Sequence, residues 1–256
     1  MKAIKKSNHE FALFIDDQLQ KQLIITDKDF VFRVQHIVRL SEDDTLIVFN
    51  KTHHARATYI KGDKKQIVFE LVTIVENVPL VPKIHWFLPV LEREAFEAAL
   101  YSATVLGATS IQPIITEKSR RQWGADKDLE RATRIMIAAA EQSKQYVLPH
   151  IKQAVVLASL AARGERGVVA SNPFEWQNNQ IKKIFFDPTG APCAQLLHHI
   201  KDTHEIILCI GPEGDLTDSE KSLLKNNNFQ FYALTPTILR ACDAVMVAQG
   251  IIRSLV

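Results

Sequence analysis

The stretch of residues 206–220 constrains the fold of this chain more than any other segment. Its first part, Ile206–Ile210, is a short apolar run rich in isoleucine, which predicts a buried strand. Gly211–Gly214 then predicts a tight loop, because glycine tolerates backbone angles that other residues resist. Thr217 and Glu220 have the spacing of a capping box, so a helix is expected to begin near Thr217. A strand, a glycine loop and a helix in this order place a ligand-sized crevice at the carboxyl end of a parallel strand.

Composition sets the broad class of protein. The chain has 256 residues, of which 46% are hydrophobic, enough for one large or two modest domains with a proper core. A net charge of +2 fits a nucleic-acid partner without requiring one. The sequence contains neither an apolar run of membrane-spanning length nor a signal-peptide core. Its three cysteines are far apart and form no C-x-x-C pair, so we expect a reduced, cytoplasmic protein without a zinc site.

Two domains are expected. The first part has short apolar runs at 11–15, 46–49, 56–60 and 66–72, which predict a small β-barrel. A helical turn at 32–39 interrupts them and is expected to point Val34, Ile37 and Val38 inward. Glu76–Lys83 carries two prolines and is interpreted as a linker. We therefore expect one domain at residues 1–76 and a second at 83–256.

The second domain has a different pattern. Predicted strands at 84–89, 110–115, 167–171, 206–210 and 229–234 alternate with predicted helices at 92–106, 128–146 and 241–255. This order is typical of an α/β domain with a largely parallel sheet. The loops 170–173, 211–214 and 234–240 each follow a strand, so they should meet at the carboxyl edge of the sheet and form a ligand site. The sequence lacks the dinucleotide-binding and Walker A glycine motifs, which removes most support for those chemistries.

The order of motifs resembles a known family. Ile210–Gly214 with its capping pair, followed by Ile238–Arg240 before the last helix, resembles the RsmE family of SPOUT-class methyltransferases. These enzymes modify uridine N3 in small-subunit (16S) ribosomal RNA. His36–Leu40, Thr116–Ser119 and Ala140–Ser143 agree, so the resemblance covers nearly the whole chain. It implies a PUA-like RNA-binding barrel, a SPOUT domain whose trefoil knot holds S-adenosylmethionine, and a homodimer whose interface helps form the site, without a metal.

Some positions depart from the family pattern. Asp215 and Leu216 replace the second half of the usual Gly-Pro-Glu-Gly-Gly-Phe loop, and Asp215 adds a negative charge there. The acid that follows the Leu-Arg pair stands one position later, at Asp243. Two alternatives therefore stay open: an RNA-binding paralogue with weakened catalysis, and a SPOUT enzyme that acts on a ribose 2′-OH or another RNA position.

The resemblance and the loop positions suggest a cofactor site and a catalytic pair. Glu213 is expected to neutralise the sulfonium or bind the ribose hydroxyls, the alternative being a solvated carboxylate. Arg240 is the leading catalytic residue, because a fixed guanidinium would stabilise the charge on a deprotonated uridine; a phosphate contact or an ion pair at the helix start is the alternative. Asp243 is a general base or a surface residue. The full set of expected cofactor residues is Ala170, Ser171, Ile210, Gly211, Glu213, Gly214, Leu234 and Leu239.

Two clusters of basic residues are candidates for RNA contact. Lys118, Arg120 and Arg121 share a loop with Trp123, a mixture that suits a splayed base and its flanking phosphates. Arg33, His36 and Arg39 are expected to contact the RNA backbone. The alternative for both clusters is a solvated surface.

Overall fold

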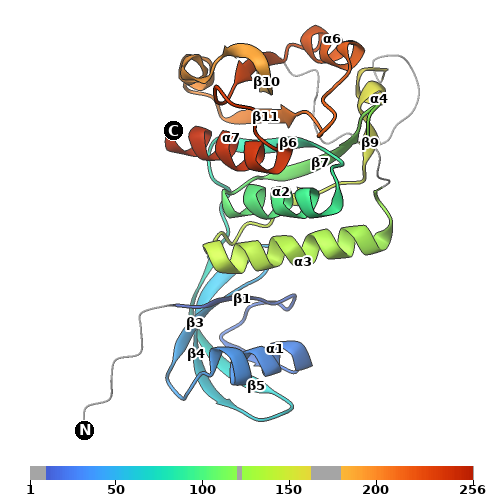
Figure 1. Cartoon of the computed structure of the whole chain (residues 1–256). Helices are drawn as coiled ribbons and strands as arrows, with labels where there is room; N and C mark the ends of the chain where they lie inside the picture. The colour runs from blue at the N-terminus through green and yellow to red at the C-terminus, as the bar shows by residue number, and fades with distance from the viewer. Residues whose placement is uncertain (1–9, 120–122, 163–179, 256) are drawn as a thin grey trace. The chain divides into compact units, whose positions relative to one another are not determined.

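The computed structural model describes residues 10–119, 123–162 and 180–255. The chain divides into two compact units. The first contains residues 1–78 and 140–147, and the second contains 79–139 and 148–256 (Figure 1). The strand predicted at 167–171 lies outside the described residues. These units are defined by contacts within the chain. The expected domains at residues 1–76 and 83–256 therefore remain a prediction.

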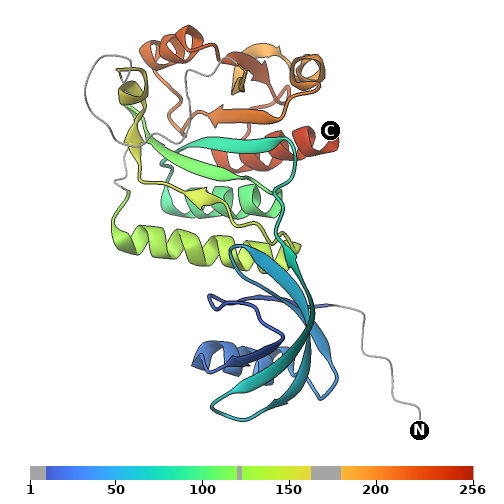
Figure 2. The same ribbon diagram turned by 180° about the vertical axis from the view of Figure 1, so that it is seen from behind.

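The first unit is built on a five-stranded sheet with the order β1-β3-β4-β5-β2. β1 is parallel to β3, and the other neighbours are antiparallel. The longer strands curve around the helical segment (Figure 2). The edge strands β1 and β2 have three and four residues and do not pair with each other in the described part of the chain. The predicted small β-barrel is therefore not confirmed, and no closed barrel is seen in the described part of this unit. The strands are β1 (Ala12–Phe14), β2 (Gln22–Ile25), β3 (Thr45–Phe49), β4 (His53–Gly62) and β5 (Ile67–Glu76).

A short helical segment covers the inner face of this sheet. Asp27 caps α1 (Lys28–Phe32) by accepting a hydrogen bond from the Phe30 amide at 2.8 Å. The chain continues as a π-helical turn, η1 (Arg33–Val38). Val34 is fully buried, as predicted, but Ile37 is 64% exposed. The inward prediction for Ile37 is wrong because it assumed α-helical spacing, whereas the i→i+5 bonds of a π-helix form a wider turn.

The second unit contains a seven-stranded sheet with the order β12-β10-β11-β6-β7-β8, and β9 also pairs with β7. Every neighbouring pair is parallel. The predicted α/β class with a parallel sheet is therefore confirmed. The strands are β6 (Lys83–Pro89), β7 (Ser110–Ile115), β8 (His150–Ile151), β9 (Val155–Val156), β10 (Lys182–Pro192), β11 (Glu205–Ile210) and β12 (Gln230–Ala233).

Helices cover both faces of the parallel sheet. Because side chains alternate along a strand, Trp86 and Leu208 enter one core with α2, α5 and α7, while Phe87 and Cys209 enter another with α4 and α6. No helix within the described ranges is both long enough and apolar enough to cross a membrane. The helices are α2 (Arg93–Val105), α3 (Asp126–Ser143), α4 (Leu157–Ala162), the short turn η2 (Cys193–Gln195), α5 (Leu196–Ile200), α6 (Asp218–Asn226) and α7 (Ala241–Leu255).

Candidate functional site

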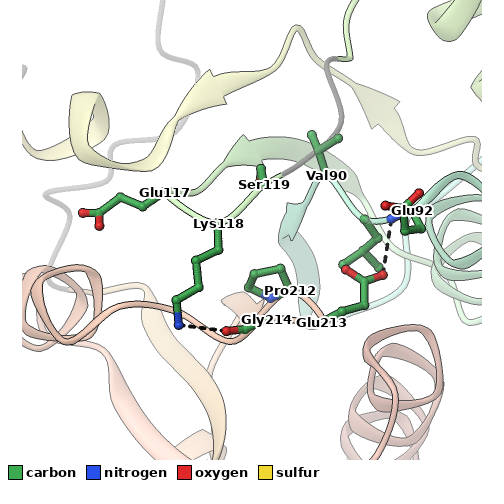
Figure 3. A pocket seen from close by; sticks show the side chains of 9 residues that line it. Val90, Glu92, Glu117, Lys118, Ser119, Pro212, Glu213 and Gly214 are labelled. Atoms are coloured by element: carbon green, nitrogen blue, oxygen red, sulfur yellow. Dashed lines mark hydrogen bonds between the residues drawn. The ribbon is translucent and has the colours of Figure 1, made fainter.

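A pocket of about 500 Å³ opens at the carboxyl edge of the parallel sheet. The loops after β6, β7 and β11 form its walls (Figure 3). These strands are adjacent in the order β11-β6-β7. Of the three loops predicted to converge, 211–214 lines this pocket, residues 234–240 are not among its described lining, and 170–173 lies outside the described residues. The described residues that line the pocket are Val90, Leu91, Glu92, Glu117, Lys118, Ser119, Pro212, Glu213 and Gly214.

The Gly-Pro-Glu-Gly loop is held from two sides of this pocket. The Lys118 ammonium donates a hydrogen bond to the Gly214 carbonyl at 2.8 Å, and the Glu92 amide donates to Glu213 Oε1 at 3.3 Å (Figure 3). The pocket thus gathers two predicted cofactor residues and one residue predicted to contact RNA. Among its described lining, Glu92, Glu117 and Glu213 are acids and Lys118 is the base, so the pocket favours a cationic ligand.

The start of α6 fixes the end of the same loop. The Thr217 hydroxyl accepts a hydrogen bond from the Glu220 amide at 3.3 Å, and Glu220 Oε2 accepts one from the Thr217 amide at 3.0 Å. The predicted capping box is confirmed. Glu220 is only 4% exposed, and its second oxygen accepts from the Glu117 amide at 2.9 Å. This carboxylate therefore ties the loop after β11 to the loop after β7.

Asp215 occupies a backbone conformation that glycine adopts most easily. Its φ is +59°, in the left-handed region, which costs other residues about 1–2 kcal/mol but which Asp tolerates better. One Asp215 oxygen accepts from the Leu216 amide at 2.7 Å, and the other pairs with the Lys221 ammonium at 2.7 Å. The charge expected to disturb the cofactor loop is therefore paired within the protein.

Lys221 also pairs with Asp187 at 2.7 Å, and the Asp187 side chain is 1% exposed. Burial lowers the pKa of Lys221, but its hydrogen bonds to Asp187 and Asp215 outweigh burial and hold that pKa above its ordinary value. Burial also raises the pKa of Asp187, and the bonds from Lys221 and Thr189 reverse this, leaving the pKa of Asp187 below its ordinary value. The bridge is thus fully charged at neutral pH.

Arg240 and Asp243 form an ion pair at the start of α7. Arg240 Nε donates to Asp243 Oδ2 at 2.8 Å, and the Arg240 side chain is 81% exposed. Hydrogen bonding to Arg240 lowers the pKa of Asp243, and the same bond raises the pKa of Arg240. Neither residue is among the described residues that line the pocket. The predicted cofactor residues Leu234 and Leu239 are half-buried and pack against the core that contains α2 and α7.

The residues of the first unit that were predicted to contact RNA differ in their surroundings. Arg33 forms a two-bond pair with Glu141, at 3.1 and 2.6 Å, within this unit. His36 lies against the Phe32 ring, with centroids 4.8 Å apart, and both residues are exposed. Arg39 is exposed, and its Nε donates to the His36 carbonyl at 3.1 Å. Arg33 is therefore engaged internally, whereas His36 and Arg39 face solvent within the unit.

Sequence reasoning missed part of the pocket and misjudged one aromatic residue. Val90 and Leu91 fall between the predicted strand at 84–89 and the predicted helix that begins at Glu92. Their place after a strand next to β11 was the available signal. Trp123 was expected to help bind a base, but it is 9% exposed and packs on Phe96 with ring centroids 5.5 Å apart. The predicted residues Ala170, Ser171, Arg120 and Arg121 lie outside the described residues.

Within residues 10–119, 123–162 and 180–255, no group of three or more His, Cys, Asp or Glu side chains is arranged to hold a metal ion.

Comparisons with known proteins agree on one family. Residues 78–253 match the model of the RNA methyltransferase domain. Ribosomal RNA small subunit methyltransferase E of Synechocystis sp. is 28% identical over 228 residues, covering 87% of this chain and 70% of that protein. The protein of the same name from Rickettsia conorii is 24% identical over 249 residues, covering 95% of each.

A solved structure shares the fold. Ribosomal RNA small subunit methyltransferase E from Neisseria gonorrhoeae, bound to S-adenosyl methionine, superposes with a TM-score of 0.79. It is 20% identical, and the match covers 96% of this chain and 98% of that one. The predicted resemblance is confirmed: the chain belongs to the RNA methyltransferase domain family, among relatives named ribosomal RNA small subunit methyltransferase E.

Proposed function

We propose that this protein transfers a methyl group from S-adenosylmethionine to N3 of a uridine in small-subunit (16S) ribosomal RNA. The family supports the reaction class, and the names of the relatives support the RNA. The observation that carries the proposal to particular residues is the acid-lined pocket on the Gly-Pro-Glu-Gly loop. It lies at the carboxyl edge of a parallel sheet, where α/β folds bind ligands.

The residues of this edge fit a cationic methyl donor. S-adenosylmethionine supplies a methyl group that is already activated by its positive sulfonium. Glu213 and Glu92 provide negative charge, and Val90, Leu91 and Pro212 provide apolar surface. In this proposal, backbone groups of Ile210, Gly211 and Gly214 bind the donor, and Leu234 and Leu239 are its apolar neighbours. Ala170 and Ser171 stay predicted members of the same site.

Arg240 and Asp243 would act on the acceptor. When uridine N3 loses its proton, negative charge spreads to O2 and O4, and a guanidinium stabilises that charge. The ion pair with Asp243 fixes the Arg240 side chain by two hydrogen bonds. Because this pairing lowers the pKa of Asp243, the carboxylate is a weak proton acceptor in this arrangement. We therefore propose Arg240 as the catalytic residue, with Asp243 orienting it, and retain general-base action by Asp243 as the competing assignment.

RNA binding would involve both units. His36 is exposed beside the Phe32 ring, and the exposed Arg39 donates to the His36 carbonyl, a combination of charge and aromatic surface that suits RNA. Lys118 stands at the pocket, and Arg120 and Arg121 follow it in the sequence. Arg33 would orient the helical segment through Glu141. In this proposal the first unit is a PUA-like module, and the partner is ribosomal RNA or the small ribosomal subunit in the cytoplasm.

The second unit is proposed to be a knotted SPOUT domain that works as a homodimer. Ile238 is 86% exposed and Met246 is 52% exposed, so apolar side chains stand in solvent before and along α7. A second copy would cover them and lie close to Arg240. Light scattering tests this expectation: a dimer mass supports it, and a monomer at micromolar concentration contradicts it.

A methyl-transfer assay tests the activity. Purified protein is incubated with S-adenosylmethionine carrying a labelled methyl group and small ribosomal subunits from a strain without the corresponding enzyme. We expect label in the ribosomal RNA of the subunit. A folded protein that binds the donor and RNA but transfers no label would favour the weakened paralogue and contradict the proposal.

A further inference from the structure

Lys221 joins three elements around the Gly-Pro-Glu-Gly loop. It lies in α6, pairs with Asp215 at the end of the loop, and pairs with Asp187 in β10, each at 2.7 Å. In the register of β10 and β11, Phe186 pairs with Ile210. Asp187 is the next residue after Phe186, so it stands beside the first residue of the loop. The loop is therefore anchored to the neighbouring strand through one ammonium group.

The Asp215 side chain closes back over the start of the loop. A Cβ placed on Gly211 would meet Asp215 Oδ1 at 3.1 Å, so little space is left between them. The Asp215 amide donates to the Pro212 carbonyl at 2.9 Å, and Asp215 Oδ1 accepts from the Leu216 amide. The carboxylate thus depends on Lys221 at one oxygen and shapes the turn with the other.

The φ of Asp215 explains why such support is needed in this chain. The φ of Asp215 is +59°, at which a glycine would need no side-chain partner. With Asp, the left-handed conformation is strained unless surrounding contacts hold it. Lys221, which is itself paired with the buried Asp187, provides that contact.

We propose that Lys221 is a positioning residue for the methyl-donor loop, acting through Asp215 and anchored by Asp187. The inference rests on the proposed function in one respect, namely that the loop binds S-adenosylmethionine. Lys221 itself is not among the described residues that line the pocket, so its effect on the donor would be indirect.

A double-mutant cycle in one background isolates this role. Lys221→Met alone would leave the Asp187 carboxylate buried and unpaired, which endangers folding. All test proteins therefore carry Asp187→Asn, which removes the buried charge but keeps a side-chain oxygen that can accept a hydrogen bond from Lys221. Lys221→Met and Asp215→Gly are added singly and together. The measurements are the Kd for S-adenosylmethionine by calorimetry and the hydrogen exchange of amides 211–217 in the ligand-free protein. Lys221→Arg in the wild-type chain is the conservative control.

The expected result is conditional on Asp215. When Asp215 is present, Lys221→Met should raise the Kd for S-adenosylmethionine at least fivefold and speed the hydrogen exchange of the loop amides. When residue 215 is glycine, the same substitution should change the Kd and the exchange rate less than twofold. Lys221→Arg should keep the Kd within about twofold of the wild type. Equal changes in both backgrounds, or no change beside Asp215, would overturn the inference. If the wild-type protein binds no donor, the proposed function fails, while the exchange data still decide the role of Lys221.

Discussion

The two edges of the parallel sheet use polar residues in opposite ways. At the amino edge, where β6, β7 and β11 begin, polar groups contact one another. His85 is 7% exposed, and its Nδ1 lies 2.9 Å from Ser110 Oγ. At the carboxyl edge of the same strands, Glu92, Lys118 and Glu213 line a pocket and are exposed.

Arg253 shows most clearly what the amino edge does. Its guanidinium donates hydrogen bonds to the carbonyls of Leu106, Pro82 and Gly107 at 3.0, 2.8 and 2.7 Å. These carbonyls end α2 and precede β6 and β7, so one side chain joins α7 to the start of the sheet. Backbone carbonyls that accept hydrogen bonds from a charged side chain contribute to the stability of the fold. The amino edge therefore joins α7 to the sheet through Arg253, whereas the carboxyl edge is where we propose that the reaction takes place.

The largest expected effect is on activity, from Arg240→Met at the carboxyl edge. Loss of one group that stabilises developing charge reduces kcat by about 100- to 1000-fold. Because Arg240 is 81% exposed on its side chain, the free energy of unfolding should change by less than about 0.5 kcal/mol. Single-turnover methyl transfer and urea unfolding measure the two quantities. Unchanged transfer would remove Arg240 from the mechanism.

Asp243→Asn separates the two assignments of this carboxylate. If Asp243 orients Arg240, the variant loses activity equally across neutral and mildly acidic pH. If Asp243 is the general base, the wild-type rate should fall as the carboxylate is protonated, and the variant should lose that acid limb.

Arg253→Ala at the amino edge should cost about 2–4 kcal/mol of stability, because it leaves three carbonyls without their charged donor. Chemical denaturation measures the loss. Ser254→Ala is the matched control, since Ser254 is the next residue and is exposed. If Arg253→Ala lowers the free energy of unfolding by less than about 1 kcal/mol, the amino edge does not stabilise the fold as described here.

His85 predicts a pH dependence of stability. Burial first, and then the charges of Lys152 and Lys83, lower the pKa of His85 from 6.5 to about 4, although Glu205 opposes them. The unfolded state therefore binds a proton more readily, and the stability contributed by neutral His85 is complete above pH 6.5 and falls towards pH 4. Wild type should lose on the order of 2 kcal/mol more across this window than His85→Gln.

Urea unfolding at pH 7 and pH 4 checks this difference. His150→Gln, at an exposed position of β8, should behave as wild type. Parallel pH profiles for wild type and His85→Gln would show that the amino edge is not acid-sensitive through His85.

The smallest expected effect is on donor affinity. Glu213→Gln keeps the shape of the side chain but removes its charge, so the Kd for S-adenosylmethionine should rise about tenfold, equivalent to about 1.4 kcal/mol. Glu94→Gln, exposed in the first turn of α2, is the control with unchanged Kd. An unaltered Kd for Glu213→Gln would place the donor's cation elsewhere.

Local patterns predicted much of the second unit. The bounds of β7 and α7 were predicted correctly, and the capping box at Thr217 was found from its spacing. β10 was missed because Lys183 and Asp187 interrupt its apolar pattern. Both are buried, at 3% and 2% exposure. A sequence pattern does not show that Lys221, far along the chain, neutralises Asp187.

The candidate site was predicted in part for the same reason. The glycine loop was recognisable because its turn requires particular residues, and Glu213 and Gly214 do line the pocket. Glu92 was read only as the start of a helix, since its approach to Glu213 depends on strand order. Likewise, the pairing of Asp215 with Lys221 is a tertiary contact, so the sequence alone suggested an uncompensated charge.

The most direct test of the account is nucleoside mass spectrometry of the methylated product. Small ribosomal subunits from a strain without the modification are treated with the purified protein and S-adenosylmethionine, and their RNA is digested to nucleosides. We predict 3-methyluridine in amounts that approach one per subunit, and its loss with Arg240→Met. A 2′-O-methylated nucleoside, a methylated base other than uracil, or an unmodified digest would contradict the proposed reaction.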